Sequence, residues 1–174
     1  MVELITKKDL QSNCLGKGLH EVAIEQPEWL LTTYESPVWY LRIDSKGYDN
    51  SHFTISWEYS FVKEICDRSP YWILVAKLAT YHCMQSKKVK CNKTTSLAVY
   101  AREIRSICFW LCSERKCLGL ESVTKTDIEA YETHVAGLYV TKGTVTTKLI
   151  CLQTLWVLRA EIGSGLSFNP YVQT

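Results

Sequence analysis

Ser96-Leu-Ala-Val-Tyr-Ala-Arg-Glu-Ile-Arg-Ser-Ile-Cys-Phe-Trp-Leu111 is the stretch of this chain with the clearest helical pattern. Its small and apolar side chains recur at intervals of three and four residues, the spacing of one helix face: Leu97, Ala101, Ile104, Cys108 and Leu111. Polar residues fall between them, namely Arg102, Glu103, Arg105 and Ser106. The pattern predicts an amphipathic helix with one face for a core and the other for a charged partner.

Similar patterns on both sides of this stretch predict three more helices. One extends from about residue 71 to 85, and the central helix begins with a cap at residues 94–96 and continues to about residue 116. A third occupies about residues 125–135, because Thr124 and Asp127 have the spacing of a capping box. Thr144 is expected to cap a fourth, which ends near residue 162 before Gly163. Helices joined by such short connections predict a compact four-helix bundle.

The chain before residue 70 has a different character. Residues 38–43 and 53–57 are rich in aromatic and β-branched side chains, and turn-forming residues separate the two runs. This pattern predicts a β-hairpin. We therefore expect a mainly α protein with two parts: an N-terminal appendage (1–69) that contains the hairpin at about residues 38–57, and a helical domain (70–174).

The formal net charge of +2 conceals an uneven distribution. Residues 85–117 carry eight basic and two acidic side chains, a net +6, whereas residues 1–84 carry −3 and residues 118–174 carry −1. Screening limits each charge to a range of about 8 Å in physiological salt, so a local patch can attract a polyanion even on a nearly neutral molecule. The pattern favours a nucleic-acid partner for the basic segment and a structural or protein-contact role for the N-terminal appendage.

The eight cysteines raise the question of a metal or disulfide protein. None of them forms a Cys-x-x-Cys pair, and those at 108, 112 and 117 lie within or just after the central helix, so we expect reduced thiols, no metal and no cofactor. No apolar run reaches the roughly 20 residues that cross a bilayer, and the N-terminus has no apolar signal sequence. The expected location is the cytoplasm, with no membrane partner.

Four short motifs occur in order between about residues 70 and 172. They are Thr95-Ser96-Leu97 before Tyr100, followed by Arg102-Glu103-Ile104 and Trp110-Leu111; Val123-Thr124-x-x-Asp127-Ile128-Glu129-Ala130-Tyr131; Thr144-Val145-x-x-Lys148-Leu149-x-x-Leu152-x-x-Leu155-Trp156; and Asn169-Pro170. In this order and at these spacings they resemble the core-binding domain of tyrosine recombinases, the phage-integrase-like enzymes. The resemblance implies a SAM-like four-helix bundle that serves as the DNA-binding portion of a site-specific recombinase.

The same resemblance implies that this chain is not itself an enzyme. In the family a separate catalytic domain follows the bundle and uses a His-x-x-Arg motif and a nucleophilic tyrosine, and no His-x-x-Arg motif occurs here. The implied partners are double-stranded DNA, the catalytic domain of the same recombinase and other recombinase protomers. The implied role is to clamp duplex DNA during DNA integration and recombination.

In that family the second and fourth helices of the bundle face the DNA. Polar residues on these helices and in the lysine-rich linker before them are therefore the candidate contacts, because cations suit phosphates and Arg, Lys and Thr can reach base edges. The candidates are Lys87, Lys88, Lys90, Lys93, Thr95, Arg102, Arg105, Thr141, Lys142, Thr144, Thr146, Thr147 and Lys148.

Two other classes of protein remain open on sequence grounds. A helical protein-interaction or oligomerisation module would use exposed apolar and aromatic residues and would ignore nucleic acid. A cysteine-rich metal or redox protein would require bound zinc or a reactive thiol pair. The histidines lack ligand spacing and no acid–base pair stands on an apolar background, so no catalytic residue is predicted.

Overall fold

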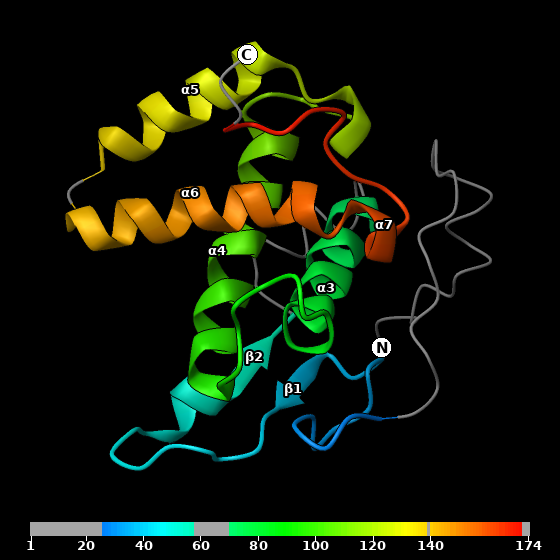
Figure 1. The fold of residues 1–174 in the computed structure, drawn as a ribbon, viewed down its shortest axis with the longest axis vertical. Helices are drawn as coiled ribbons and strands as arrows, with labels where there is room; N and C mark the ends of the chain where they lie inside the picture. Colours follow the sequence, from blue (N-terminus) through cyan, green and yellow to red (C-terminus); the bar gives the residue numbers. More distant parts are fainter. Residues whose placement is uncertain (1–25, 58–69, 139, 172–174) are drawn as a thin grey trace.

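The computed structural model describes residues 26–57, 70–138 and 140–171, which form a mainly helical structure with a small two-stranded antiparallel sheet (Figure 1). In chain order the elements are β1 (Val38–Tyr40), the 3-10 helix η1 (Asn50–Phe53), β2 (Thr54–Ser56), α3 (Pro70–Gln85), α4 (Thr94–Ser113), the 3-10 helix η2 (Leu120–Ser122), α5 (Lys125–Ala136), α6 (Lys142–Val157) and α7 (Arg159–Ile162). The predicted hairpin is confirmed, and a helix is present at each predicted place.

The predicted domain boundary between residues 69 and 70 adjoins residues 58–69, which lie outside the described part of the chain. The division into two domains therefore stays a prediction. None of the described helices combines the length and the apolar character that a membrane crossing requires.

α4 lies at the centre of the helices and packs against both α3 and α6 (Figure 1). Its fully buried apolar side chains are Leu97, Ala101, Ile104, Ile107 and Leu111. The predicted apolar stripe is thus the core face, with Ile107 added to it. Burial of such side chains, at about 25 cal/mol per Å² of apolar surface, is what attaches the neighbouring helices to α4.

The first turn of α4 is capped from a distant part of the chain. Lys93 occupies the N-cap position without a side-chain cap, so the prediction of a Thr or Ser cap at residues 94–96 is wrong. Asp44, in the hairpin loop, accepts a hydrogen bond from the backbone N–H of Thr94 at 2.8 Å. The hydroxyl of Thr94 donates in turn to the carbonyl of Arg42 at 2.8 Å. Two contacts therefore fasten the start of α4 to the hairpin.

α5 begins with the capping box that the sequence predicted. The side chain of Thr124 accepts from the N–H of Asp127 at 3.3 Å, and the carboxylate of Asp127 accepts from the N–H of Thr124 at 2.8 Å. Arg115 also binds Asp127, at 2.7 Å between Nε and Oδ1, and so connects the segment after α4 to the start of α5. The helix ends at Ala136, one residue beyond the predicted end.

The predicted fourth helix differs from the observed one at both ends. Thr141 is the cap instead of Thr144, whose N–H donates to Thr141 Oγ1 at 3.2 Å. The helix is also interrupted at Leu158, where ψ is 10°, so that α6 stops at Val157 and the short α7 follows. Gly163 then ends α7 with a left-handed φ of 80°, a conformation that favours glycine.

Aromatic side chains attach the hairpin to the helices. The ammonium group of Lys77, on α3, lies 5.1 Å from the ring centre of Tyr34, 5.5 Å from that of Trp39 and 6.0 Å from that of Trp57. Lys77 is only 7% exposed and donates a hydrogen bond to the carbonyl of Ser36 at 3.1 Å. The buried apolar residues of the hairpin and of the helices form one continuous cluster around this contact.

Candidate functional site

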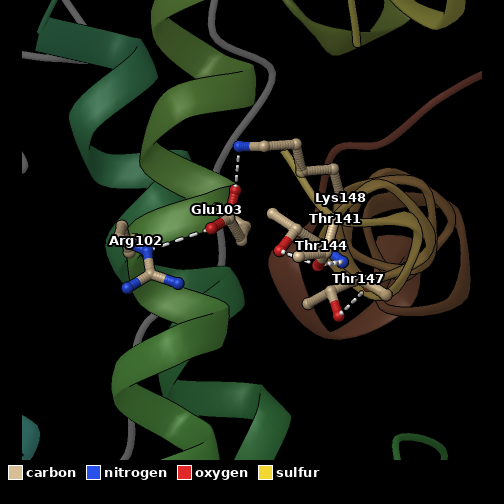
Figure 2. Close-up of polar contacts among 7 residues, drawn as sticks. Arg102, Glu103, Thr141, Thr144, Thr147 and Lys148 are labelled. Atoms are coloured by element: carbon tan, nitrogen blue, oxygen red, sulfur yellow. Dashed lines mark hydrogen bonds and ion pairs between the residues drawn. The ribbon is translucent and has the colours of Figure 1, made fainter. Parts of the chain in front are cut away.

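α4 and α6 carry most of the candidate contacts, and the two helices cross each other (Figure 1). At the crossing, Lys148 of α6 forms an ion pair with Glu103 of α4, as Figure 2 shows. The side chains are 13% and 3% exposed, respectively. Removing one member of a buried pair leaves an uncompensated charge, so Lys148 helps to hold the two helices together. It lies at the α4–α6 contact and not on the open surface.

Arg102 binds the other oxygen of the same carboxylate. Its Nε donates to Oε1 of Glu103 at 3.0 Å, while 63% of its side chain is exposed. Glu103 therefore holds a buried cation with one oxygen and a surface cation with the other. Sequence reasoning missed Glu103, although its position three residues after Tyr100 and four before Ile107 places it beside the core face.

The threonines at the start of α6 use their hydroxyl groups within the helix. Thr146 donates to the carbonyl of Lys142 at 3.0 Å, and Thr147 donates to that of Gly143 at 3.0 Å. The hydroxyls of Thr141 and Thr144 lie 3.0 Å apart. Thr146 and Thr147 could donate to a phosphate only after giving up a backbone partner. Lys142, by contrast, is exposed and forms no ion pair with another described residue.

The loop between α3 and α4 presents most of the predicted lysines. Lys87, Lys90 and Lys93 are exposed, and none of them pairs with a carboxylate in the described ranges. Lys88 forms an ion pair with Glu161 of α7 at 2.6 Å. Burial is the largest single influence and would raise the pKa of Glu161, but the hydrogen bond and charge of Lys88, together with a backbone hydrogen bond, outweigh it and the pKa lies below its usual range. The pair fastens the loop to α7.

Arg105 and Thr95 occupy less exposed positions than the sequence suggested. Arg105 donates to the carbonyl of Ser56 in β2, and its guanidinium lies 5.6 Å from the ring centre of Trp57. Arg105 thus attaches the edge of the hairpin to α4. Thr95 is half-buried in the first turn of α4.

The candidate cations do not form one continuous ridge. α6 spans 16 residues, about 24 Å at 1.5 Å per residue, with Lys142 at its first position. The lysine-rich loop is held against α7, beyond the opposite end of α6, by the pair that Lys88 makes with Glu161. Arg102 lies near Lys148, about 9 Å along the axis of α6 from Lys142. The exposed candidate cations therefore fall into three separate groups: Lys142, Arg102 and the lysine-rich loop.

The cysteines in the described ranges are free thiols, four of them buried: Cys83, Cys91, Cys108 and Cys151. Burial raises the pKa of Cys91 and of Cys151 to about 12, and that of the partly exposed Cys117 to about 11. Thiols with such pKa values stay protonated at neutral pH and are poor nucleophiles. Among the described residues, no group of three or more His, Cys, Asp and Glu side chains is arranged to hold a metal ion.

Comparison of the chain with protein-family models, with curated proteins and with solved structures finds no match in any of the three. The function is therefore argued from the residues and contacts described above.

Proposed function

We propose that this chain is a non-catalytic module that binds duplex DNA, with the role that the SAM-like core-binding bundle has in tyrosine recombinases. The observation that carries the proposal is the position of Arg102, which is 63% exposed and anchored where the two candidate helices cross. Further exposed lysines are Lys142 at the start of α6 and those of the loop between α3 and α4, which Lys88 attaches to α7. Cations held at intervals on a helical frame suit the repeating phosphates of a duplex.

In this role the bundle would hold one side of the DNA while a catalytic domain of the same recombinase, and other protomers, held the rest. The resemblance of the sequence motifs to those of the family supports this assignment, as does the net +6 of residues 85–117. Chemistry would belong to the catalytic domain, in the cytoplasm. The present chain would bind the duplex and fix the position of the protein along it through contacts to phosphates.

Salt-dependent affinity for a short duplex tests the proposal. Filter binding across a series of salt concentrations should give a log K that falls with log salt, with a slope of about −0.9 for each phosphate contacted. The triple variant K87A/K90A/K93A should flatten this slope by about 0.9 for each lysine that contacts the DNA. Absence of detectable binding at ~50 mM salt would contradict the proposal.

Lys142 and Lys125 provide a matched comparison that tests the start of α6 as a DNA contact. Each is an exposed lysine at the first position of an α-helix, Lys142 in α6 and Lys125 in α5. K142A should weaken DNA binding and reduce the salt dependence, whereas K125A should leave both unchanged. Equal effects of the two substitutions would show that the start of α6 does not contact DNA.

A protein-interaction module is the second candidate, and a feature of the hairpin favours it. Leu31 and Tyr40 lie next to each other, with the N–H of Leu31 donating to the carbonyl of Tyr40 at 2.8 Å, and the two residues are 60% and 53% exposed. Such a pair can contribute to a protein interface. This function predicts a stable oligomer or complex whose elution from gel filtration does not change when DNA is added.

A further inference from the structure

The contacts of Glu103 indicate separate roles in the proposed function for Glu103, Arg102 and Lys148. Glu103 is 3% exposed and has one cation on each carboxylate oxygen, Lys148 from α6 and Arg102 from its own helix. An exposed arginine normally samples many rotamers, and ordering it on binding costs conformational entropy. Here the buried carboxylate of Glu103, which is held by Lys148 of α6, restricts Arg102 before DNA binds.

The geometry of Arg102 leaves its outer donors available. A guanidinium carries five N–H donors, and the one on Nε is directed at Glu103 at 3.0 Å. Figure 2 shows the two terminal nitrogens of Arg102 directed away from the carboxylate. A planar fork whose stem is held, and whose terminal nitrogens bind no residue in the described ranges, is suited to bidentate contact with a phosphate or a guanine edge.

We propose that Glu103 is a positioning residue that orients Arg102 for bidentate contact with DNA, and that Lys148 fixes Glu103 without contacting the DNA itself. The inference rests on the proposed function, since it names the side chain that would make the central contact. It also explains why a carboxylate, which repels DNA phosphates, is located among the candidate cations.

The substitution E103Q tests the idea by the sign of its effect. It removes a negative charge next to the binding surface, so simple electrostatics predicts tighter binding. A glutamine keeps only one of the two oxygens, and its amide NH2 group, a donor, would face the other cation, so the positioning role predicts that the affinity for a short duplex falls by about fivefold to tenfold. Unchanged or tighter binding of a folded E103Q protein would overturn the inference.

Two further variants keep the test informative if E103Q proves unstable. R102K keeps the charge but loses the fork, so it should lose nearly as much affinity as R102A, and wild-type affinity of R102K would overturn the inference. In the R102A background, E103Q should cause no further loss, because the residue that it positions is absent. An additional loss there would show that Glu103 acts through the general stability of the fold.

The outcomes distinguish a failure of the proposed DNA binding from a failure of the positioning role of Glu103. If the wild-type chain does not bind duplex DNA, the proposed function fails and this inference fails with it. If the wild type binds and R102A weakens the binding, but E103Q and R102K do not, the proposed function stands and only the positioning role of Glu103 is rejected. Urea unfolding of each variant shows whether it is folded under the binding conditions.

Discussion

Asp44 caps a helix that begins at Thr94, 50 residues later in the chain, by accepting the N–H of Thr94 at 2.8 Å. The residue directly before the helix, Lys93, provides no side-chain cap. A contact between the hairpin loop and the helical part therefore replaces the usual local signal. It links the hairpin directly to the helix on which the candidate site is built.

Substitution of Asp44 should destabilise the protein measurably. Loss of an N-cap costs about 1 kcal/mol, so D44A should lower the free energy of unfolding by about that amount, while D44N keeps an acceptor and should lose less. Urea unfolding followed by circular dichroism measures both. Equal stability of D44A and the wild type would show that the contact contributes nothing.

The same contact predicts an acid dependence. Burial alone would raise the pKa of Asp44, but the hydrogen bonds that it accepts, chiefly the one from the backbone N–H of Thr94, together outweigh it, and the pKa lies below its usual range. A carboxyl whose folded-state pKa is lowered contributes stability above its unfolded pKa of about 3.9, and this contribution is lost as the pH falls through the folded-state value. The difference in stability between the wild type and D44A should therefore shrink below about pH 4.

Lys77 should make the free energy of unfolding depend on pH in the alkaline range. Burial lowers the pKa of Lys77 from 10.5 to about 8, and the charge of Glu35 opposes the shift only in part. Between pH 8 and pH 10.5 the unfolded chain holds the Lys77 proton more strongly than the folded protein does. The free energy of unfolding therefore rises with pH in this range. At about 1.4 kcal/mol per pKa unit, the wild type should gain about 2.5 kcal/mol over K77M between pH 7 and pH 10.

The comparison with K77M is needed because the buried cysteines have the opposite effect. Their raised pKa values cost stability once the pH exceeds the pKa of an unfolded thiol, and both proteins share that loss. Urea unfolding under reducing conditions at each pH gives the difference. A difference that stays constant from pH 7 to pH 10 would contradict the burial of a charged Lys77.

Two glycines should respond in opposite directions to alanine. A Cβ on Gly165 would lie 2.2 Å from Cβ of Arg159 and 3.1 Å from the carbonyl oxygen of Leu155, so G165A must displace the backbone and should cost about 1–3 kcal/mol. At Gly143, in α6, the described atom nearest to that position is Thr141 Oγ1, at 3.9 Å. G143A should therefore stabilise the protein, by up to about 1 kcal/mol, through helix propensity. Thermal unfolding of the pair measures both signs.

Arg105 should prove structural although it lies on the candidate helix. R105A removes the hydrogen bond to Ser56 and the contact with Trp57, so it should lower the free energy of unfolding by about 1–2 kcal/mol. Its exposed neighbour Ser106 provides the control, because S106A should change stability by less than about 0.5 kcal/mol. A loss of DNA affinity in R105A, without a loss of stability, would reverse this assignment.

The features that the sequence predicted correctly depend on residues close together in the chain. The apolar stripe of α4 and the Thr124–Asp127 capping box are local patterns, and both are present in the structure. The cap of α6 was misplaced because Thr141 and Thr144 are three residues apart and either can begin a helix. Local pattern alone does not choose between two such threonines.

Several contacts of the fold and of the candidate site depend on pairings that no local pattern contains. Lys77 donates to a carbonyl 41 residues away, and Lys148 reaches a carboxylate 45 residues away. In the sequence, Lys148 looks like any lysine on a polar helix face, because the partner that buries it lies on another helix. The same reason explains why Glu103 was overlooked as the residue to which both cations are attached.

The aromatic cage around Lys77 gives the molecule a built-in optical reporter. Trp39 and Trp57 come from the hairpin and are 0% and 4% exposed, so their fluorescence emission depends on whether the hairpin is seated against α3. Far-ultraviolet circular dichroism is dominated instead by the helices. Trp72, Trp110 and Trp156 lie on the helices, so the measurement uses a protein in which these three are replaced by phenylalanine. If its two signals change at the same denaturant concentration, hairpin and helices unfold as one cooperative unit, and if the emission shifts first, the hairpin detaches while the helices persist.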